Sequence, residues 1–174
     1  LKMTVNIQPQ LPTIQADAQR IRQIVTNLMD NAVKFTAEGE IRVSAVSATL
    51  QETPTIAGFT IPDKFKVRSG KWLVVSVSDT GIGIAKEDQG YIFDAFRQVD
   101  SSSVRKFEGS GLGLAITQQL ARIHGGFLWV ESELGKGSTF VVLLPMRTEI
   151  TYQPLVEVAD STRPTILLVD DDPT

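Results

Sequence analysis

Residues 17–36 hold the pattern that decides the fold, DAQRIRQIVTNLMDNAVKFT. Apolar residues recur in this stretch at spacings of three and four, which is the period of a helix with one face in a core. The stretch therefore predicts a helix from Asp17 to about Lys34, which Gly39 ends. Its apolar positions are Ile21, Ile24, Val25, Leu28, Met29, Ala32 and Phe35.

A polar line borders the apolar face of this helix and contains Arg20, Asn27, Asn31 and Lys34. Asparagine is a poor former of helix interiors, because its side chain competes for backbone groups. One interpretation is functional: the two amide oxygens bind Mg²⁺, and Lys34 contacts phosphate oxygens. The other is an ordinary solvated face, which is the commoner explanation of such a line taken alone. Both remain open at this point.

The rest of the chain alternates strands and helices around that first helix. Helices on one face of such a sheet form a two-layer α/β sandwich of the α+β type. We expect a mixed, mostly antiparallel sheet of about five strands against three helices. The expected strands are Met3–Gln8, Glu40–Leu50, Lys71–Ser78, Phe127–Glu133 and Ser138–Leu144; the further helices are Ala85–Phe96 and Leu112–Ile123; Gln51–Gly70 is a long hairpin insertion without a clear period, and Arg97–Ser110 a mobile loop.

Composition excludes several classes of function. The chain has 174 residues, a hydrophobic fraction of 42% and a net charge of −3, as expected of one globular domain. The negative net charge argues against a protein that binds nucleic acid through phosphate contacts. It contains no cysteine and one histidine, which excludes disulfides and makes a zinc site improbable. No apolar run is long enough to span a bilayer, so we expect a cytoplasmic domain without direct membrane contact. The chain opens in mid-pattern without an initiator Met, which is typical of a fragment.

Two glycine-rich segments could bind a nucleotide. Asp79-Thr80-Gly81-Ile82-Gly83 follows a strand, where a carboxylate can accept a hydrogen bond from the exocyclic amine of adenine, although plain Asp-Thr-Gly turns are common. Gly109-Ser110-Gly111-Leu112-Gly113 opens a helix, whose N-terminal N–H groups favour phosphate. The second segment is not the dinucleotide motif, because Leu114 takes its last position, and Gly135–Ser138 lacks the upstream glycine of a P-loop.

Five segments together resemble the catalytic, ATP-binding domain of sensor histidine kinases. They occur in that family's order and cover residues 17–145. Asn27–Thr36 resembles the N box, Asp79–Ile84 the first glycine box, Ile92–Gln98 the F box, Gly109–Ile116 the second glycine box and Gly135–Phe140 the closing Gly-Ser-Thr-Phe signature. The resemblance implies the Bergerat fold, in which ATP lies under a lid on a helix–sheet sandwich.

Carried over residue by residue, the resemblance implies a role for each box. Asn27 and Asn31 would bind Mg²⁺ and, with Lys34, form the catalytic set. Asp79 would read adenine, and Gly81, Gly83 and Thr139 would line its pocket. The lid and the second glycine box would supply the phosphate contacts, through Arg97, Arg105, Lys106, Gly109, Gly111, Leu112 and Gly113.

The resemblance also divides the chain and names its partners. Residues 1–147 would form the catalytic domain, 148–164 a linker and 165–174 the first strand of a receiver domain, with the acidic pair Asp170 and Asp171. The parent would then be a hybrid kinase, a homodimer with a dimerisation and phosphoacceptor domain and a downstream receiver. His124 follows a helix and lacks the family's phosphoacceptor motif, so we expect it to be structural.

Three functions remain to be separated. The first is transfer of the γ-phosphoryl group of Mg-ATP to a histidine on the phosphoacceptor domain. The second is hydrolysis of the gyrase or chaperone type, which needs a carboxylate base where this chain has Asn27. The third is a nucleotide-binding module without chemistry.

Overall fold

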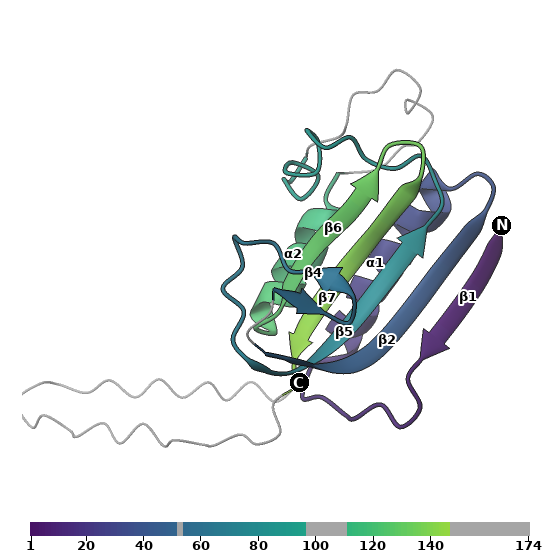
Figure 1. Ribbon diagram of the computed structural model, residues 1–174. Coiled ribbons are helices and arrows are strands. Elements are labelled where there is room, and N and C mark those ends of the chain that lie inside the picture. The colour runs from purple at the N-terminus through teal and green to yellow at the C-terminus, as the bar shows by residue number, and fades with distance from the viewer. Residues whose placement is uncertain (52–53, 97–110, 147–174) are drawn as a thin grey trace, which may run out of the picture.

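The computed structural model describes residues 1–51, 54–96 and 111–146. Its larger sheet has five strands in the order β1-β2-β5-β7-β6 (Figure 1). Strand β1 pairs with β2 in parallel, and the other neighbours are antiparallel. The prediction of a mixed, mostly antiparallel five-stranded sheet is thus confirmed. The strands of this sheet are β1 (Lys2–Ile7), β2 (Glu40–Leu50), β5 (Gly70–Asp79), β6 (Phe127–Glu133) and β7 (Gly137–Pro145).

Two helices, α1 (Ala18–Phe35) and α2 (Gly113–Ile123), lie side by side on one face of this sheet, called here the inner face (Figure 1). Asp17 caps α1, since its Oδ1 accepts hydrogen bonds from the backbone N–H groups of Gln19 and Arg20. Among the helices in the described ranges, none is long and apolar enough to cross a membrane. The core between helices and sheet contains Ile24, Leu28, Ala32, Ile41, Val77, Ala121, Leu128 and Val142.

The third predicted helix, Ala85–Phe96, is wrong. This stretch is a series of turns in which the Asp88 N–H bonds the Ala85 carbonyl and the Tyr91 N–H bonds the Asp88 carbonyl. Phe93 is nevertheless buried, and its ring packs edge-on against Phe140 with centroids 6.4 Å apart. The stretch is therefore anchored to the core through a buried aromatic side chain, without forming a helix.

The opposite, outer face of the sheet carries a second apolar core. The insertion forms a two-stranded hairpin, β3 (Thr55–Ile56) with β4 (Phe59–Thr60), and then an extended segment to β5. Its Ile56 and Ile61 are buried with the outward side chains of the large sheet. The insertion thus covers the part of the outer face whose buried side chains are Leu50, Trp72, Val74, Trp129, Val141 and Leu143.

Candidate functional site

Asp79 is the last residue of β5 and faces the helices, because it alternates with Ser78 and shares a face with Val75 and Val77 of the inner core. Its Oδ1 accepts hydrogen bonds from the Gly81 backbone N–H at 2.9 Å and from the Thr36 hydroxyl at 3.5 Å. Thr36 is the C-cap of α1 and is buried. The carboxylate is therefore fixed where the end of β5 meets the end of α1.

Burial raises the pKa of the Asp79 carboxyl above its usual range. Hydrogen bonds from the backbone N–H groups of Gly81 and Ser138 and from the Thr36 hydroxyl oppose this rise without cancelling it. One more hydrogen-bond donor would stabilise the ionised form of a carboxylate that is removed from water in this way. An amino group of a ligand would supply such a donor.

Gly81 and Gly83 bring three segments of the chain together at this carboxylate. A Cβ on Gly81 would overlap the Phe35 carbonyl oxygen and lie 2.9 Å from Oδ1 of Asp79. Gly83 has φ +69°, and a Cβ there would overlap the Glu133 carbonyl oxygen. Any larger residue at either position would push the loop away from α1 or from the β6–β7 turn, and would open the site.

Backbone and side-chain hydrogen bonds hold the same loop from both sides. The Ile82 N–H donates to the Phe35 carbonyl at 3.2 Å, and the Ile82 carbonyl accepts from the Gly135 N–H at 2.7 Å. The Ile84 N–H donates to the Ser132 hydroxyl at 2.8 Å. The first glycine segment is thus anchored to α1 on one side and to the β6–β7 hairpin on the other.

Asn27 connects the two helices. Its Nδ2 donates to the Thr117 hydroxyl at 3.2 Å and to the Gly113 carbonyl at 3.4 Å, and Thr117 itself donates to Gly113 at 2.7 Å. The amide nitrogen is therefore committed to α2. Its oxygen accepts no hydrogen bond from the described residues, so it remains available to a ligand.

Asn31 and Lys34 follow Asn27 on the half of α1 that ends beside Asp79. Asn31 lies one turn after Asn27 and is partly exposed. The Lys34 ammonium lies 5.1 Å from the centroid of the Phe35 ring. The two asparagines and Lys34 therefore lie on α1, and Asp79 lies at the end of β5, where the end of α1 meets it.

The start of α2 completes the described part of the site. Gly111 has φ +68°, Leu112 is the N-cap residue, and no side chain caps the helix that begins at Gly113. A helix start without a side-chain cap offers backbone N–H groups to an anion. The remaining predicted phosphate contacts, Arg97, Arg105, Lys106 and Gly109, lie outside the described residues.

The structure does not bring Thr139 to this site. Thr139 pairs with Ser78, and its hydroxyl donates to the Ser78 hydroxyl at 3.0 Å on the outer face. Ser138 pairs with Asp79 and is buried on the inner face. The residue of the Gly-Ser-Thr-Phe signature that lies on the face of Asp79 is therefore Ser138, which sequence reasoning did not single out. Counting two residues back from inward-facing Phe140 gives the same assignment.

Comparison with known proteins gives the family. Residues 16–148 match the model described as "Histidine kinase-, DNA gyrase B-, and HSP90-like ATPase". The chain belongs to this family. Its relatives are histidine kinases: it is 41% identical over 138 residues to Histidine protein kinase 1 of Candida albicans, covering 79% of this chain and 5% of that protein. It is 40% identical over 141 residues to the histidine-protein kinase BarA of Escherichia coli K12, covering 80% of this chain and 14% of BarA.

Solved structures agree with this assignment. Full-length ShkA in complex with AMPPNP matches with a TM-score of 0.63 and 34% identity, over 85% of this chain and 26% of that one. The catalytic domain of histidine kinase ThkA matches with a TM-score of 0.58 and 25% identity, over 83% of this chain and 78% of that one. The chain is thus a histidine kinase ATPase domain of the two-component type, and it spans only a small part of its curated relatives.

Proposed function

We propose that this domain binds Mg-ATP on the inner face and donates the γ-phosphoryl group to a histidine on a separate dimerisation domain. In that step the bond between the γ-phosphorus and the β–γ bridging oxygen breaks, a phosphorus–nitrogen bond forms on the imidazole, and ADP leaves. The observation that carries the proposal is the Asp79 carboxylate, held by Gly81 and Thr36 at the junction of β5 and α1.

Asp79 suits adenine because a carboxylate accepts the exocyclic amine of this base. Guanine presents a carbonyl oxygen at the corresponding position, and two acceptors repel each other. The loop of Gly81 and Gly83 is fixed on both sides, so the carboxylate is positioned before the base arrives. Pre-positioning of this kind lowers the entropy that binding costs.

The amide oxygens of Asn27 and Asn31 fit Mg²⁺, which prefers oxygen ligands and keeps several waters when phosphates complete its shell. The hydrogen bonds from Asn27 Nδ2 to α2 orient the opposite end of the amide, its Oδ1. Bound there, Mg²⁺ would neutralise charge on the phosphates. Lys34 and the N–H groups at the start of α2 would bind the phosphate oxygens and align the terminal group for transfer.

His124 is not the acceptor. Its Nδ1 bonds the Leu120 carbonyl at 2.8 Å, and its Nε2 accepts the Asp17 N–H at 3.2 Å, so both ring nitrogens are used to join the two helices. His124 also lies at the end of α2 opposite Gly113. The acceptor must therefore come from another domain, as in our sequence-based expectation of a structural His124.

Hydrolysis is the weaker alternative, because Asn27 stands where a gyrase-type enzyme would need a base, and an amide cannot take a proton from water.

The experiment that tests the proposal is incubation of the chain with γ-labelled ATP and Mg²⁺, alone and with a histidine-kinase dimerisation domain in trans. We expect no label on the chain alone and acid-labile label on the histidine of the added domain. Free phosphate without transfer would favour hydrolysis, binding without either product a non-catalytic module, and label on His124 would contradict the proposal.

A further inference from the structure

The extended part of the insertion has two chemically different sides. Lys64, Lys66 and Arg68 alternate with Phe65 and Val67. The three basic residues are exposed, whereas Phe65 and Val67 are partly buried and pack against the outer core. The segment therefore presents a row of cations to solvent, called here the basic row (Lys64, Lys66 and Arg68).

Aromatic contacts hold the basic row in place on the sheet. The Phe65 ring lies 5.1 Å from the Phe127 ring and 6.3 Å from the Trp129 ring, measured between centroids. At the other end of the row, the Trp72 indole N–H donates to the Arg68 carbonyl at 3.0 Å. The charges are thus mounted on a fixed backbone, which lowers the ordering cost of binding a partner.

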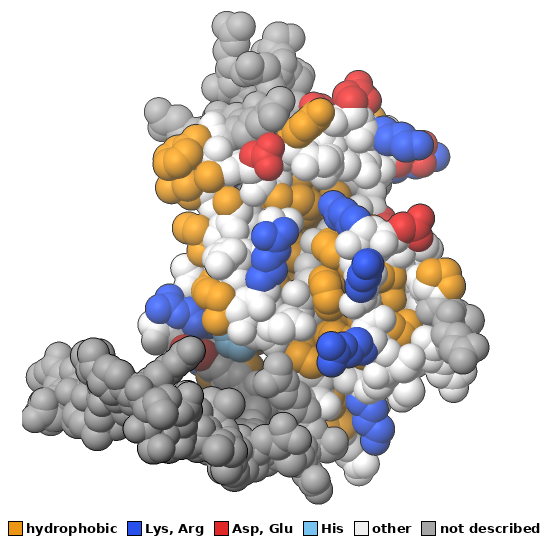
Figure 2. Space-filling view, turned by 90° about the vertical axis from the view of Figure 1, so that its left-hand side faces the viewer, with side chains coloured by type: hydrophobic (Ala, Val, Ile, Leu, Met, Phe, Trp, Pro, Cys, Tyr) orange, Lys and Arg blue, Asp and Glu red, His pale blue; other side chains and the backbone are white. Residues whose placement is uncertain are grey.

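The basic row has no partner of opposite charge in the described part of the chain. No ion pair there involves these three residues. Residues 54–71 contain four basic side chains and one acidic side chain, in a protein whose net charge is −3. Figure 2 looks onto the side of the molecule along which this segment runs in Figure 1, and shows Lys and Arg side chains gathered there while Asp and Glu lie mainly at the upper end.

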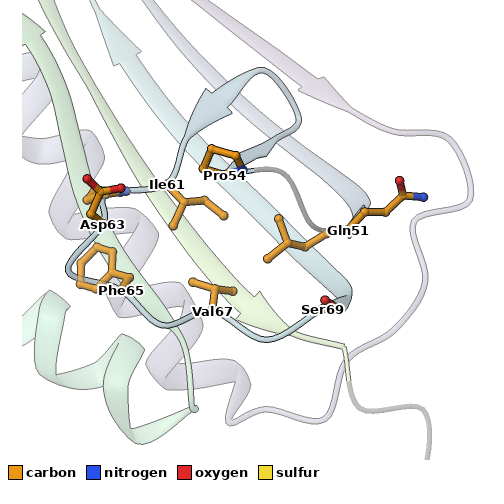
Figure 3. A pocket seen from close by; sticks show the side chains of 9 residues that line it. Gln51, Pro54, Ile61, Asp63, Phe65, Val67 and Ser69 are labelled. Atoms are coloured by element: carbon orange, nitrogen blue, oxygen red, sulfur yellow. The ribbon is translucent and has the colours of Figure 1, made fainter.

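The end of β7 lies beside the segment that carries the basic row. The Met146 N–H donates to the carbonyl of Lys71, three residues after Arg68. A hollow of about 490 Å³ opens between the insertion and the end of β2, lined among others by Leu50, Val67 and Ser69 (Figure 3). Met146, the last described residue after β7, is therefore bonded to a residue only three positions from the basic row.

We propose that the basic row docks the acidic cluster Asp170–Asp172 of this chain's own C-terminal segment. Residues 147–174 contain six acidic and two basic residues, so their charge complements that of the insertion. The 23 residues between Met146 and Asp170 can span up to about 75 Å at about 3.3 Å per residue, and Met146 is bonded to Lys71, three residues after Arg68. A tether of this kind gives an effective concentration on the order of millimolar, so weak charge pairing suffices.

This docking surface is independent of the nucleotide site. Phe65, Val67 and the outer core lie on the face opposite Asp79. Docking would keep the downstream acidic unit beside the catalytic domain while leaving the ATP site open. Loss of docking and loss of ATP binding are therefore separable results.

A single nitroxide tests the proposal directly, because the chain contains no cysteine. Thr174→Cys carrying the label should broaden the amide NMR signals of residues 61–71 in the full 174-residue chain. The broadening should disappear in about 1 M salt, where the Debye length is about 3 Å. It should also disappear in Lys64→Glu/Lys66→Glu/Arg68→Glu and return when Asp170→Lys/Asp171→Lys/Asp172→Lys is added.

The matched control places the same charge change elsewhere, as Lys2→Glu/Arg22→Glu/Lys86→Glu at three exposed positions, and should keep the broadening. Broadening centred on α1, or broadening that survives both high salt and the triple substitution in the basic row, would overturn the proposal. So would its absence, and co-sedimentation of such a chain with phosphatidylserine vesicles would then assign the row to a membrane surface.

Discussion

The two faces of the central sheet differ in what they hold, although the same strands build both. On β5, Asp79 faces the helices and the candidate nucleotide site, while its neighbour Ser78 faces outward and accepts a hydrogen bond from Thr139. Farther along β5, Val75 belongs to the inner core and Val74 to the outer core. Alternation along one strand thus separates the face with the candidate nucleotide site from the face that the insertion covers by a single residue step.

The insertion covers an apolar part of the outer face. The part of the outer face around Trp72 and Trp129 is apolar and aromatic, and Ile56 and Ile61 of the insertion are buried against it. The insertion therefore stabilises the fold and, at the same time, carries the basic row.

The largest expected effect is on the outer core. Trp129→Ala should lower the free energy of unfolding by about 3–5 kcal/mol, because it removes a large side chain that is 3% exposed. Urea denaturation measures the loss. The matched control is Trp129→Phe, which keeps an aromatic ring while removing an indole N–H that has no hydrogen-bond partner among the described residues, and should cost much less. A loss below about 1 kcal/mol for the alanine variant would contradict the outer core as part of one cooperative fold.

The next effect is on ATP binding at the inner face. Asp79→Asn should weaken ATP affinity about 10- to 100-fold, since it removes a charge-assisted hydrogen bond worth about 1.5–3 kcal/mol. Calorimetry measures the change. The control is Thr139→Val. Thr139 pairs with Ser78, the residue before Asp79, on the outer face, and its substitution should leave ATP affinity unchanged. Equal losses in both variants would break the separation of the faces.

A third prediction concerns the asparagines of α1. Asn31→Ala should abolish the Mg²⁺-dependent part of ATP affinity and leave the fold intact, because its side chain is partly exposed. Titrations with Mg²⁺ and with a chelator provide the readout. Wild type and variant responding equally to Mg²⁺ would mean that the polar line of α1 is only a solvated face.

The smallest expected effect is on stability against pH. Burial raises the pKa of Asp79 in the folded state above its unfolded value, so ionised Asp79 costs stability above the folded pKa. This cost disappears as pH falls through the folded pKa towards the unfolded value. The stability of Asp79→Asn relative to wild type should therefore be highest near neutral pH and shrink in acid. Denaturation series at several pH values would show it, and a difference that grows in acid would contradict the burial of this carboxyl.

The helices and strands whose sequence signal is local could be predicted from the sequence. The period from Ile21 to Phe35 predicted α1, and the predicted strand Glu40–Leu50 has the bounds that β2 has in the structure. These patterns depend on neighbours within a few residues, so they need no knowledge of the tertiary structure.

The failures concern long-range contacts. Phe65 packs against Phe127, and the two-residue strands β3 and β4 have no period to detect. Sequence reasoning named Thr139 without knowing that it lies on the face opposite Asp79, because that needs the register of β7 against β5, which the pairing of Asp79 with Ser138 supplies. The predicted linker at 148–164 and the receiver-like strand at 165–174 lie outside the described residues and stay predictions.

The most direct test of the separation of the two faces is NMR mapping of a non-hydrolysable ATP analogue with Mg²⁺ on the 174-residue chain. We predict shifts in the backbone amides of Asn31, Asp79, Gly81, Gly83 and Gly113, and none in Phe65, Val67, Trp72 or Trp129. Shifts confined to the insertion and the outer core, with Asp79 and Gly81 unmoved, would contradict the account.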